Sequence, residues 1–190
     1  LYGNIAPTGA VIKPTAASPD LMVHKGKAIV FEDHDDLGNR IDDQDLEVSP
    51  DDILVMKNSG PIGGPGIPEW GFLPIPKKIL ATGVRDMVRL SDARMSGTAF
   101  GTVVVHVTPE SAGGGPLSAI RDGDMIELDV PNRKLNLLVT DEELAERLNA
   151  HKNRAPDFKR GYKWLHAQHI LQADKGCDFD FLRAESLQSD

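Results

Sequence analysis

The sequence has 190 residues and a net charge of −8, from 21 basic and 29 acidic side chains. A chain of this length forms a single domain with a sizeable core and leaves room for an appendage. The acidic balance and the lack of a basic stripe argue against a nucleic-acid partner. No apolar run reaches the roughly 20 residues that span a bilayer, and no signal peptide opens the chain, so we expect no membrane partner and a cytoplasmic protein.

Two further features limit the chemistry. The single cysteine, Cys177, rules out an internal disulfide and any iron–sulfur cluster held by several cysteines of this chain alone. The chain begins at Leu1 rather than at methionine, so we expect a fragment of a longer protein or a processed product.

Short apolar runs alternate with turn signals along the whole chain. Strands are predicted at residues 9–13, 27–32, 51–57, 87–92 and 101–107, with a hairpin at 125–140 that turns at 131–133. Short helices are predicted at 76–81 and 117–121. Thr140 and Glu143 form a capping box that opens a helix ending near His151, and a last helix is predicted from Tyr162 to Ala173.

These elements predict a mixed α and β fold, with a barrel-like or two-layer sheet of seven or eight short strands and three or four peripheral helices. We expect the barrel-like domain to cover residues 1–155. The C-terminal helix and tail, residues 156–190, are expected to pack on that domain or on a neighbour. A polar, proline-containing linker, KNRAPDFKRG, joins the two parts.

An acidic stretch covers residues 31–52, which carry ten carboxylates against one base, Arg40. An EF-hand loop that began at Asp33 would have Leu37 and Gln44 at positions where calcium ligands are required. A solvated acidic face or helix–loop region is therefore favoured over a calcium site.

A glycine–proline loop, SGPIGGPGIPEW (59–70), indicates a functional site. Four glycines and three prolines lie between Gly60 and Glu69, too many for a helix or a strand. The loop ends in a carboxylate, Glu69, and Ser96 follows in SDARMSGTAFG (91–101), between two predicted strands. The glycines match neither a P-loop nor a dinucleotide turn, and no G-x-S-x-G elbow surrounds Ser96. A plain surface connection with a hydrogen-bonded serine is the alternative.

Three histidines and the cysteine have no assigned role. His106 has apolar strand neighbours on both sides, which favours a packed or hydrogen-bonded core residue over a catalytic one. His166 and His169 have the i, i+3 spacing of two metal ligands, but no third ligand accompanies them. The role of Cys177 is open as well.

Several segments carry a resemblance to a known family. The segments GPIGGPGIPE, DARMSGT, HVTPESAGGGP, RDGDMIELDVPNRKLNLLV and the opening GNIAP with GAVIK resemble the C-terminal domain of the dihydroxy-acid and sugar-acid dehydratases, in the expected order and over nearly the whole chain. The resemblance implies a swivelling β/β/α domain similar to that of aconitase-like enzymes. It also implies removal of water from a 2,3-dihydroxy acid to give a 2-keto-3-deoxy acid.

The same resemblance implies roles for single residues. Glu69 corresponds to a magnesium ligand, and Ser96 to the proton acceptor, which acts as an alkoxide. Thr98 would donate a hydrogen bond to the departing hydroxyl or to the enediolate, whereas Arg94 has no assigned role. A serine hydroxyl is too weak a base at neutral pH, so a nearby positive charge has to lower its pKa.

The implied cofactors are Mg²⁺ and an iron–sulfur cluster of the 2Fe–2S type, both held mostly by an N-terminal dehydratase domain that is absent here. The 190 residues alone are therefore expected to fold but to have no dehydratase activity. The implied partners are that N-terminal domain, a sugar-acid substrate and further copies of the chain in a homodimer or homotetramer.

Two segments bear on the substrate. DARMSGT and GCDFDFL look more like the pentonate and hexonate dehydratases than like the branched-chain amino-acid enzyme, for which DGRFSGG is typical. The alternatives are the dihydroxy-acid dehydratase of branched-chain amino-acid biosynthesis, a non-catalytic barrel that serves as an interaction module, and a calcium-binding domain.

Overall fold

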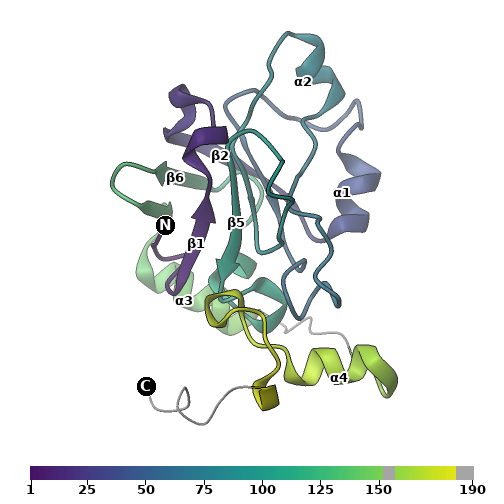
Figure 1. Cartoon of the computed structure of the whole chain (residues 1–190). Coiled ribbons are helices and arrows are strands. Elements are labelled where there is room, and N and C mark those ends of the chain that lie inside the picture. Colours follow the sequence, from purple (N-terminus) through teal and green to yellow (C-terminus); the bar gives the residue numbers. More distant parts are fainter. Residues whose placement is uncertain (152–156, 183–190) are drawn as a thin grey trace.

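One curled seven-stranded sheet organises the protein (Figure 1). A computed structural model describes residues 1–151 and 157–182. The strands lie in the order β1-β5-β4-β3-β2-β6-β7, and the pairs from β2 to β5 through β3 and β4 are parallel. The outer pairs are antiparallel. The strands are β1 (Gly9–Ile12), β2 (Val23–Phe31), β3 (Ile53–Met56), β4 (Arg89–Ser91), β5 (Val103–Thr108), β6 (Met125–Asp129) and β7 (Lys134–Leu137).

The first two residues join the two edges of this sheet. Leu1 exchanges backbone hydrogen bonds with Ala10 on β1, at 2.8 and 2.9 Å. Tyr2 donates to Arg133 and accepts from Leu135, so it pairs with β7 on its other side. The segment thereby satisfies edge groups that would otherwise remain unpaired. The predicted mixed α and β fold with a barrel-like sheet is confirmed.

Two hydrophobic clusters lie on the two faces of the central strands. Along β3, Ile53 and Val55 point into a cluster enclosed by the sheet, together with Ile126 and Leu135. The alternate residues of β3 point into a second cluster on the outer face, beneath α1 and α2. All four residues of β3 are buried. An unbroken apolar run such as ILVM is what a parallel strand covered on both faces requires.

The described residues form four α-helices: α1 (His34–Arg40), α2 (Lys77–Ala81), α3 (Asp141–Ala150) and α4 (Gly161–His169). The acidic stretch supplies α1, because the Asp33 side chain caps it by accepting from the Asp36 amide at 2.9 Å. Thr140 caps α3 as predicted, at 3.2 Å from the Glu143 amide. The Glu143 carboxylate does not reach back, however, because it binds Arg147 instead.

Two predicted helices differ from the observed elements. Residues 116–119 form a single 3-10 turn rather than a helix at 117–121. The last helix ends at His169 instead of Ala173, because Ile170 pairs with Phe179 in an isolated bridge. Part of the predicted linker, residues 152–156, lies outside the described residues, and so does the end of the tail. The division into 1–155 and 156–190 stays a prediction.

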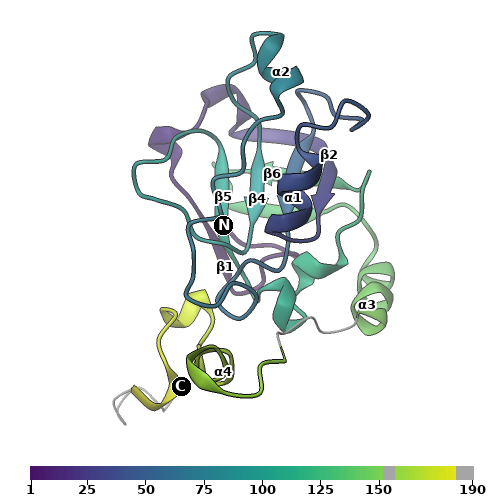
Figure 2. The ribbon, with the colours of Figure 1, turned by 90° about the vertical axis from the view of Figure 1, so that its right-hand side faces the viewer.

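The C-terminal segment lies at the carboxyl end of β5, below the sheet in Figures 1 and 2. It comprises α4 and two 3-10 turns, at Ala173–Lys175 and Asp180–Leu182. The glycine–proline loop also leaves the sheet at this end, because it follows β3. Of the helices in the described ranges, none has the length and apolar character to cross a bilayer.

Candidate active site

A buried aspartate joins the carboxyl ends of three parallel strands. Asp92 follows β4, and its Oδ1 accepts from the Ser59 amide beyond β3 at 2.9 Å. Its Oδ2 accepts from the amide and the hydroxyl of Ser111 beyond β5, at 2.9 and 2.5 Å. Burial raises the pKa of Asp92, and the bonds from Ser111 and Ser59 oppose that rise. In α/β proteins this edge of a sheet is where ligands bind.

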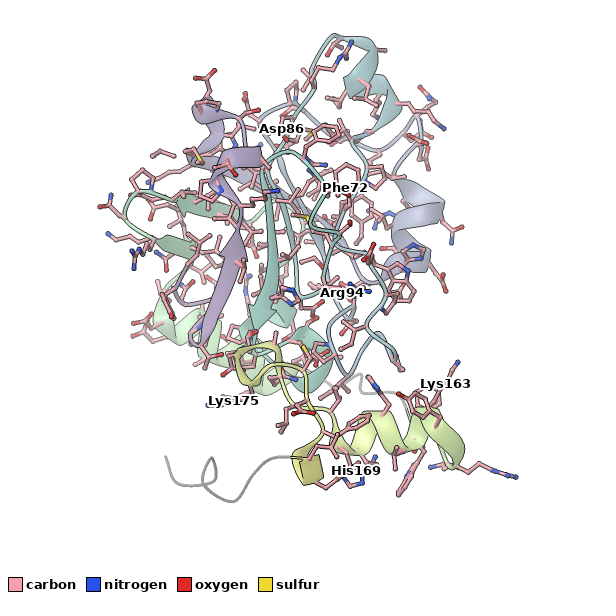
Figure 3. The ribbon with its side chains drawn as sticks, in the orientation of Figure 1. Phe72, Asp86, Arg94, Lys163, His169 and Lys175 are labelled. Atoms are coloured by element: carbon pink, nitrogen blue, oxygen red, sulfur yellow. The ribbon has the colours of Figure 1, made fainter. Side chains whose placement is uncertain are left out.

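Arg94 holds the glycine–proline loop against the serine segment, which is residues 91–101 and carries Ser96. Its Nη1 lies 3.0 Å from Glu69 Oε1, and its Nε donates to the Ile67 carbonyl at 2.5 Å. The Gly71 amide donates to the Arg94 carbonyl at 2.7 Å. A Cβ at position 71 would come within 2.7 Å of that oxygen, so the close approach requires glycine. Figure 3 shows Arg94 between β5 and α1, away from Lys163 and His169 of α4.

The two hydroxyls predicted to act in catalysis contact each other. Ser96 Oγ and Thr98 Oγ1 are 3.0 Å apart. They lie in a turn formed by residues 96–99, which the Ala99 amide closes by donating to the Ser96 carbonyl. Lys13, from the end of β1, donates to the Gly97 carbonyl at 3.0 Å and brings a positive charge beside Ser96.

His106 supports the serine segment through its backbone. Its amide donates to the Ala93 carbonyl at 3.0 Å, and its φ of 54° places it in the left-handed region. The register between β1 and β5 shifts here, as in a β-bulge, a feature that re-aims side chains next to active sites. Burial and then the charge of Arg94 lower the pKa of His106, which favours the neutral ring.

The other unassigned residues lie in the C-terminal segment. His166 is buried with its Nε2 3.0 Å from the Pro61 carbonyl, whereas His169 Nδ1 lies 3.0 Å from Asp180 Oδ1. The two histidines therefore have separate partners. Burial, and then the charges of Glu110 and Asp174, raise the pKa of the Cys177 thiol, which disfavours the reactive thiolate.

Glu69 is the residue of this site that could hold a divalent metal. Half of its side chain is exposed, so the carboxylate is open to a ligand from outside this chain. Within residues 1–151 and 157–182, no three His, Cys, Asp or Glu side chains converge into a metal site. A carboxylate oxygen suits Mg²⁺, which is often held by one or two carboxylates plus substrate and water. The residues present thus fit one ligand of a shared site.

Residues 1–177 match the model of the dihydroxy-acid/6-phosphogluconate dehydratase C-terminal family. The chain belongs to this family. A 6-deoxy-6-sulfo-D-gluconate dehydratase of Pseudomonas putida is 53% identical over 97% of the chain and 32% of its own length. An L-arabinonate dehydratase of Rhizobium leguminosarum is 56% identical over 96% of the chain and 32% of its own length.

A dihydroxy-acid dehydratase of Acetivibrio thermocellus is 38% identical over 93% of the chain and 31% of its own length. The chain thus spans about a third of the length of the curated relatives that it matches.

Sequence reasoning missed the residues that hold the segments of the candidate site in place. They are Lys13, Asp92, Glu110 and Gln172, which come from four separate parts of the chain. Lys13, Asp92 and Glu110 lie inside segments that carried the family resemblance, which was the one available signal. No sequence pattern marked Gln172, because a glutamine near the end of a predicted amphipathic helix is usually a surface residue.

Proposed function

We propose that this chain is the C-terminal part of a hydro-lyase that dehydrates a sugar acid, an aldonate, to a 2-keto-3-deoxy acid. The observation that carries the proposal is the contact of Arg94 with Glu69. It brings the carboxylate of the glycine–proline loop to the segment that bears Ser96 and Thr98.

The residues of the chain have distinct tasks in this reaction. Ser96, as the alkoxide, takes the proton from carbon 2 as the C2–H bond breaks. The electron pair of the C2–H bond forms the C2–C3 double bond as the C3–O bond breaks. The hydroxide leaves as water with the proton that Ser96 took from carbon 2, which returns Ser96 to the alkoxide. Thr98, 3.0 Å from Ser96, donates a hydrogen bond to the departing oxygen. The resulting enol becomes the 2-keto acid by proton transfer to carbon 3.

Two cofactors belong to the proposal. When bound, Mg²⁺ stabilises the charge that develops on the substrate carboxylate, and an iron–sulfur cluster supplies a Lewis acid for the 3-hydroxyl. Glu69 would hold the Mg²⁺ from this chain. Because Cys177 is the only cysteine, the cluster ligands would lie in the N-terminal part of the full-length enzyme. We propose a homodimer or homotetramer as its assembly.

The identities of the relatives favour an aldonate as substrate. The two named sugar-acid dehydratases are 53% and 56% identical to the chain, whereas the dihydroxy-acid dehydratase is 38% identical. Both kinds of substrate present the same 2,3-dihydroxy acid to Ser96, and they differ in the part beyond carbon 3.

A substrate panel tests the proposal. The full-length enzyme, purified without oxygen and supplied with Mg²⁺, is expected to form 2-keto-3-deoxy acids from pentonates or hexonates. 2,3-Dihydroxyisovalerate and the isolated 190-residue chain are the comparison reactions, and the isolated chain is expected to be inactive. Turnover of dihydroxyisovalerate alone would assign the enzyme to the branched-chain amino-acid branch. No turnover by a cluster-loaded enzyme would contradict the dehydratase function.

Lys13 is expected to activate Ser96 through its charge. Replacing it, as Lys13→Met, removes the cation whose Nζ donates to the neighbouring Gly97 carbonyl. The pKa of the Ser96 hydroxyl should then rise, so the acidic limb of the kcat/KM profile should move up by about one pH unit. At pH 7 this corresponds to about a tenfold loss of kcat/KM. The control is Lys134→Met, which replaces an exposed lysine of β7. An unshifted pH profile in Lys13→Met would refute the role of Lys13.

A further inference from the structure

A second buried carboxylate, Glu110, holds the glycine–proline loop at its start. Glu110 follows β5 and is 1% exposed. Its Oε1 accepts from the Ile62 amide at 2.8 Å, and its Oε2 accepts from the Gly63 amide at 2.9 Å. Two successive backbone amides of the loop therefore point at one carboxylate, which fixes both the position and the direction of the loop there.

The C-terminal segment holds that carboxylate from the other side. Gln172 donates from Nε2 to Glu110 Oε1 at 2.7 Å, and its Oε1 accepts from the Glu110 amide at 2.8 Å. This reciprocal pair fixes the Glu110 side chain against its own backbone. The ring of His166, from α4, lies against the same part of the loop, 3.0 Å from the Pro61 carbonyl.

The loop is shaped around Glu110. A Cβ at Gly60 would come within 2.6 Å of Glu110 Oε2, so the backbone can approach the carboxylate only as glycine. From this point hydrogen bonds continue along the loop, from the Gly64 amide to the Gly60 carbonyl and from the Ile67 amide to the Gly64 carbonyl. Ile67 is the residue whose carbonyl accepts from Arg94, two positions before Glu69.

We propose that Glu110, oriented by Gln172, is a positioning residue that sets the placement of Glu69 through the backbone of the glycine–proline loop. Glu110 is too buried to touch a substrate. Its effect reaches the site through the amides of residues 62 and 63 and the hydrogen bonds that follow them. The inference rests on the proposed function, in which Glu69 is a metal ligand.

The alternative is that the Glu110–Gln172 pair only stabilises the fold. The two explanations predict different metal affinities for a variant that breaks the Glu110–Gln172 pair and keeps the fold. Gln172→Met separates them well, because methionine keeps the length of this half-buried side chain and loses both hydrogen bonds. Gln168→Ala, an exposed glutamine of α4, is the matched control.

The test measures Mn²⁺ affinity of the full-length enzyme from the electron paramagnetic resonance of free Mn²⁺, without turnover. We expect Gln172→Met and Glu110→Gln to weaken Mn²⁺ binding about tenfold, as residues that orient metal ligands commonly do. Gln168→Ala should stay at the wild-type value. Hydrogen exchange of residues 60–72 should become faster in both variants, while the far-ultraviolet circular dichroism and the cluster absorption stay unchanged.

Glu69→Gln is the reference that separates the two possible failures. If Glu69→Gln weakens Mn²⁺ binding while folded Gln172→Met and Glu110→Gln keep the wild-type affinity, the positioning role is wrong and the proposed metal ligand stands. If Glu69→Gln itself leaves the affinity unchanged, the metal assignment of the proposed function fails, and the positioning role fails with it.

Discussion

Ser96→Ala in the full-length enzyme is expected to lower kcat for aldonate dehydration by about 10²- to 10⁴-fold, the usual contribution of a positioned general base. The substitution removes the oxygen that takes the carbon-2 proton and leaves no replacement, because the nearest hydroxyl, Thr98, only hydrogen-bonds to it. KM and metal affinity should change little, since neither depends on the alkoxide. The rate of 2-keto-3-deoxy acid formation at saturating substrate measures the effect.

Two further variants sharpen this result. Thr98→Val keeps the shape of the side chain and loses the hydrogen-bond donor, so we expect a smaller loss of about tenfold in kcat. Ser49→Ala changes an exposed serine of the acidic stretch and should leave kcat unaltered. Retention of most of the wild-type rate by a cluster-loaded Ser96→Ala enzyme would remove Ser96 from the mechanism.

Asp86→Ala is expected to destabilise the domain by about 3–5 kcal/mol, because it removes the carboxylate that balances the charge of the buried Arg89 guanidinium. Arg89 is 1% exposed and lies 2.9 Å from Asp86 Oδ1. Asp86 also accepts from the amide and hydroxyl of Thr102, at 2.9 and 2.7 Å, and from the Ser18 amide. The midpoint of thermal unfolding should fall by about 10 °C.

The pH dependence provides a check with a definite sign. Although burial opposes its ionisation, the hydrogen bonds from Thr102 and Ser18 and the charge of Arg89 hold the pKa of Asp86 below its ordinary value. A carboxyl with a lowered pKa stabilises the fold above its unfolded pKa, about 4, and loses that contribution as the pH falls through the folded value. The difference in midpoint between wild type and Asp86→Ala should therefore shrink below about pH 4.

Asp20→Ala serves as the control, because it removes an aspartate whose side chain is exposed. Its unfolding midpoint should match that of the wild type. Equal midpoints for Asp86→Ala and Asp20→Ala would show that the buried ion pair contributes nothing to stability.

The site is assembled from segments that meet only because of the order of the strands. β3, β4 and β5 are parallel neighbours, so the segments after their carboxyl ends lie side by side, and Asp92 binds all three together. Glu110 then fixes the beginning of the glycine–proline loop, and Arg94 fixes its end. Glu69 and Ser96 thus owe their positions to residues that take no direct part in the proposed chemistry.

The sequence by itself determined the features that depend on neighbouring residues. The apolar run ILVM predicted buried β3, and Thr140 predicted the start of α3, because strand burial and helix capping are set within a few residues. Glycine and proline marked the loop between β3 and Glu69 for the same reason. The family resemblance added the roles of Ser96, Thr98 and Glu69, which remain predictions.

Only the tertiary structure decided how distant residues meet. Arg94 and Glu69 are 25 positions apart, and Glu110 and Gln172 are 62 apart, so their contacts depend on strand order and on where the C-terminal segment lies. The early end of α4 has the same cause, since Ile170 leaves the helix to pair with Phe179. Local patterns do not encode such pairings, because their free energy comes from burial and hydrogen bonds that exist only once the sheet has formed.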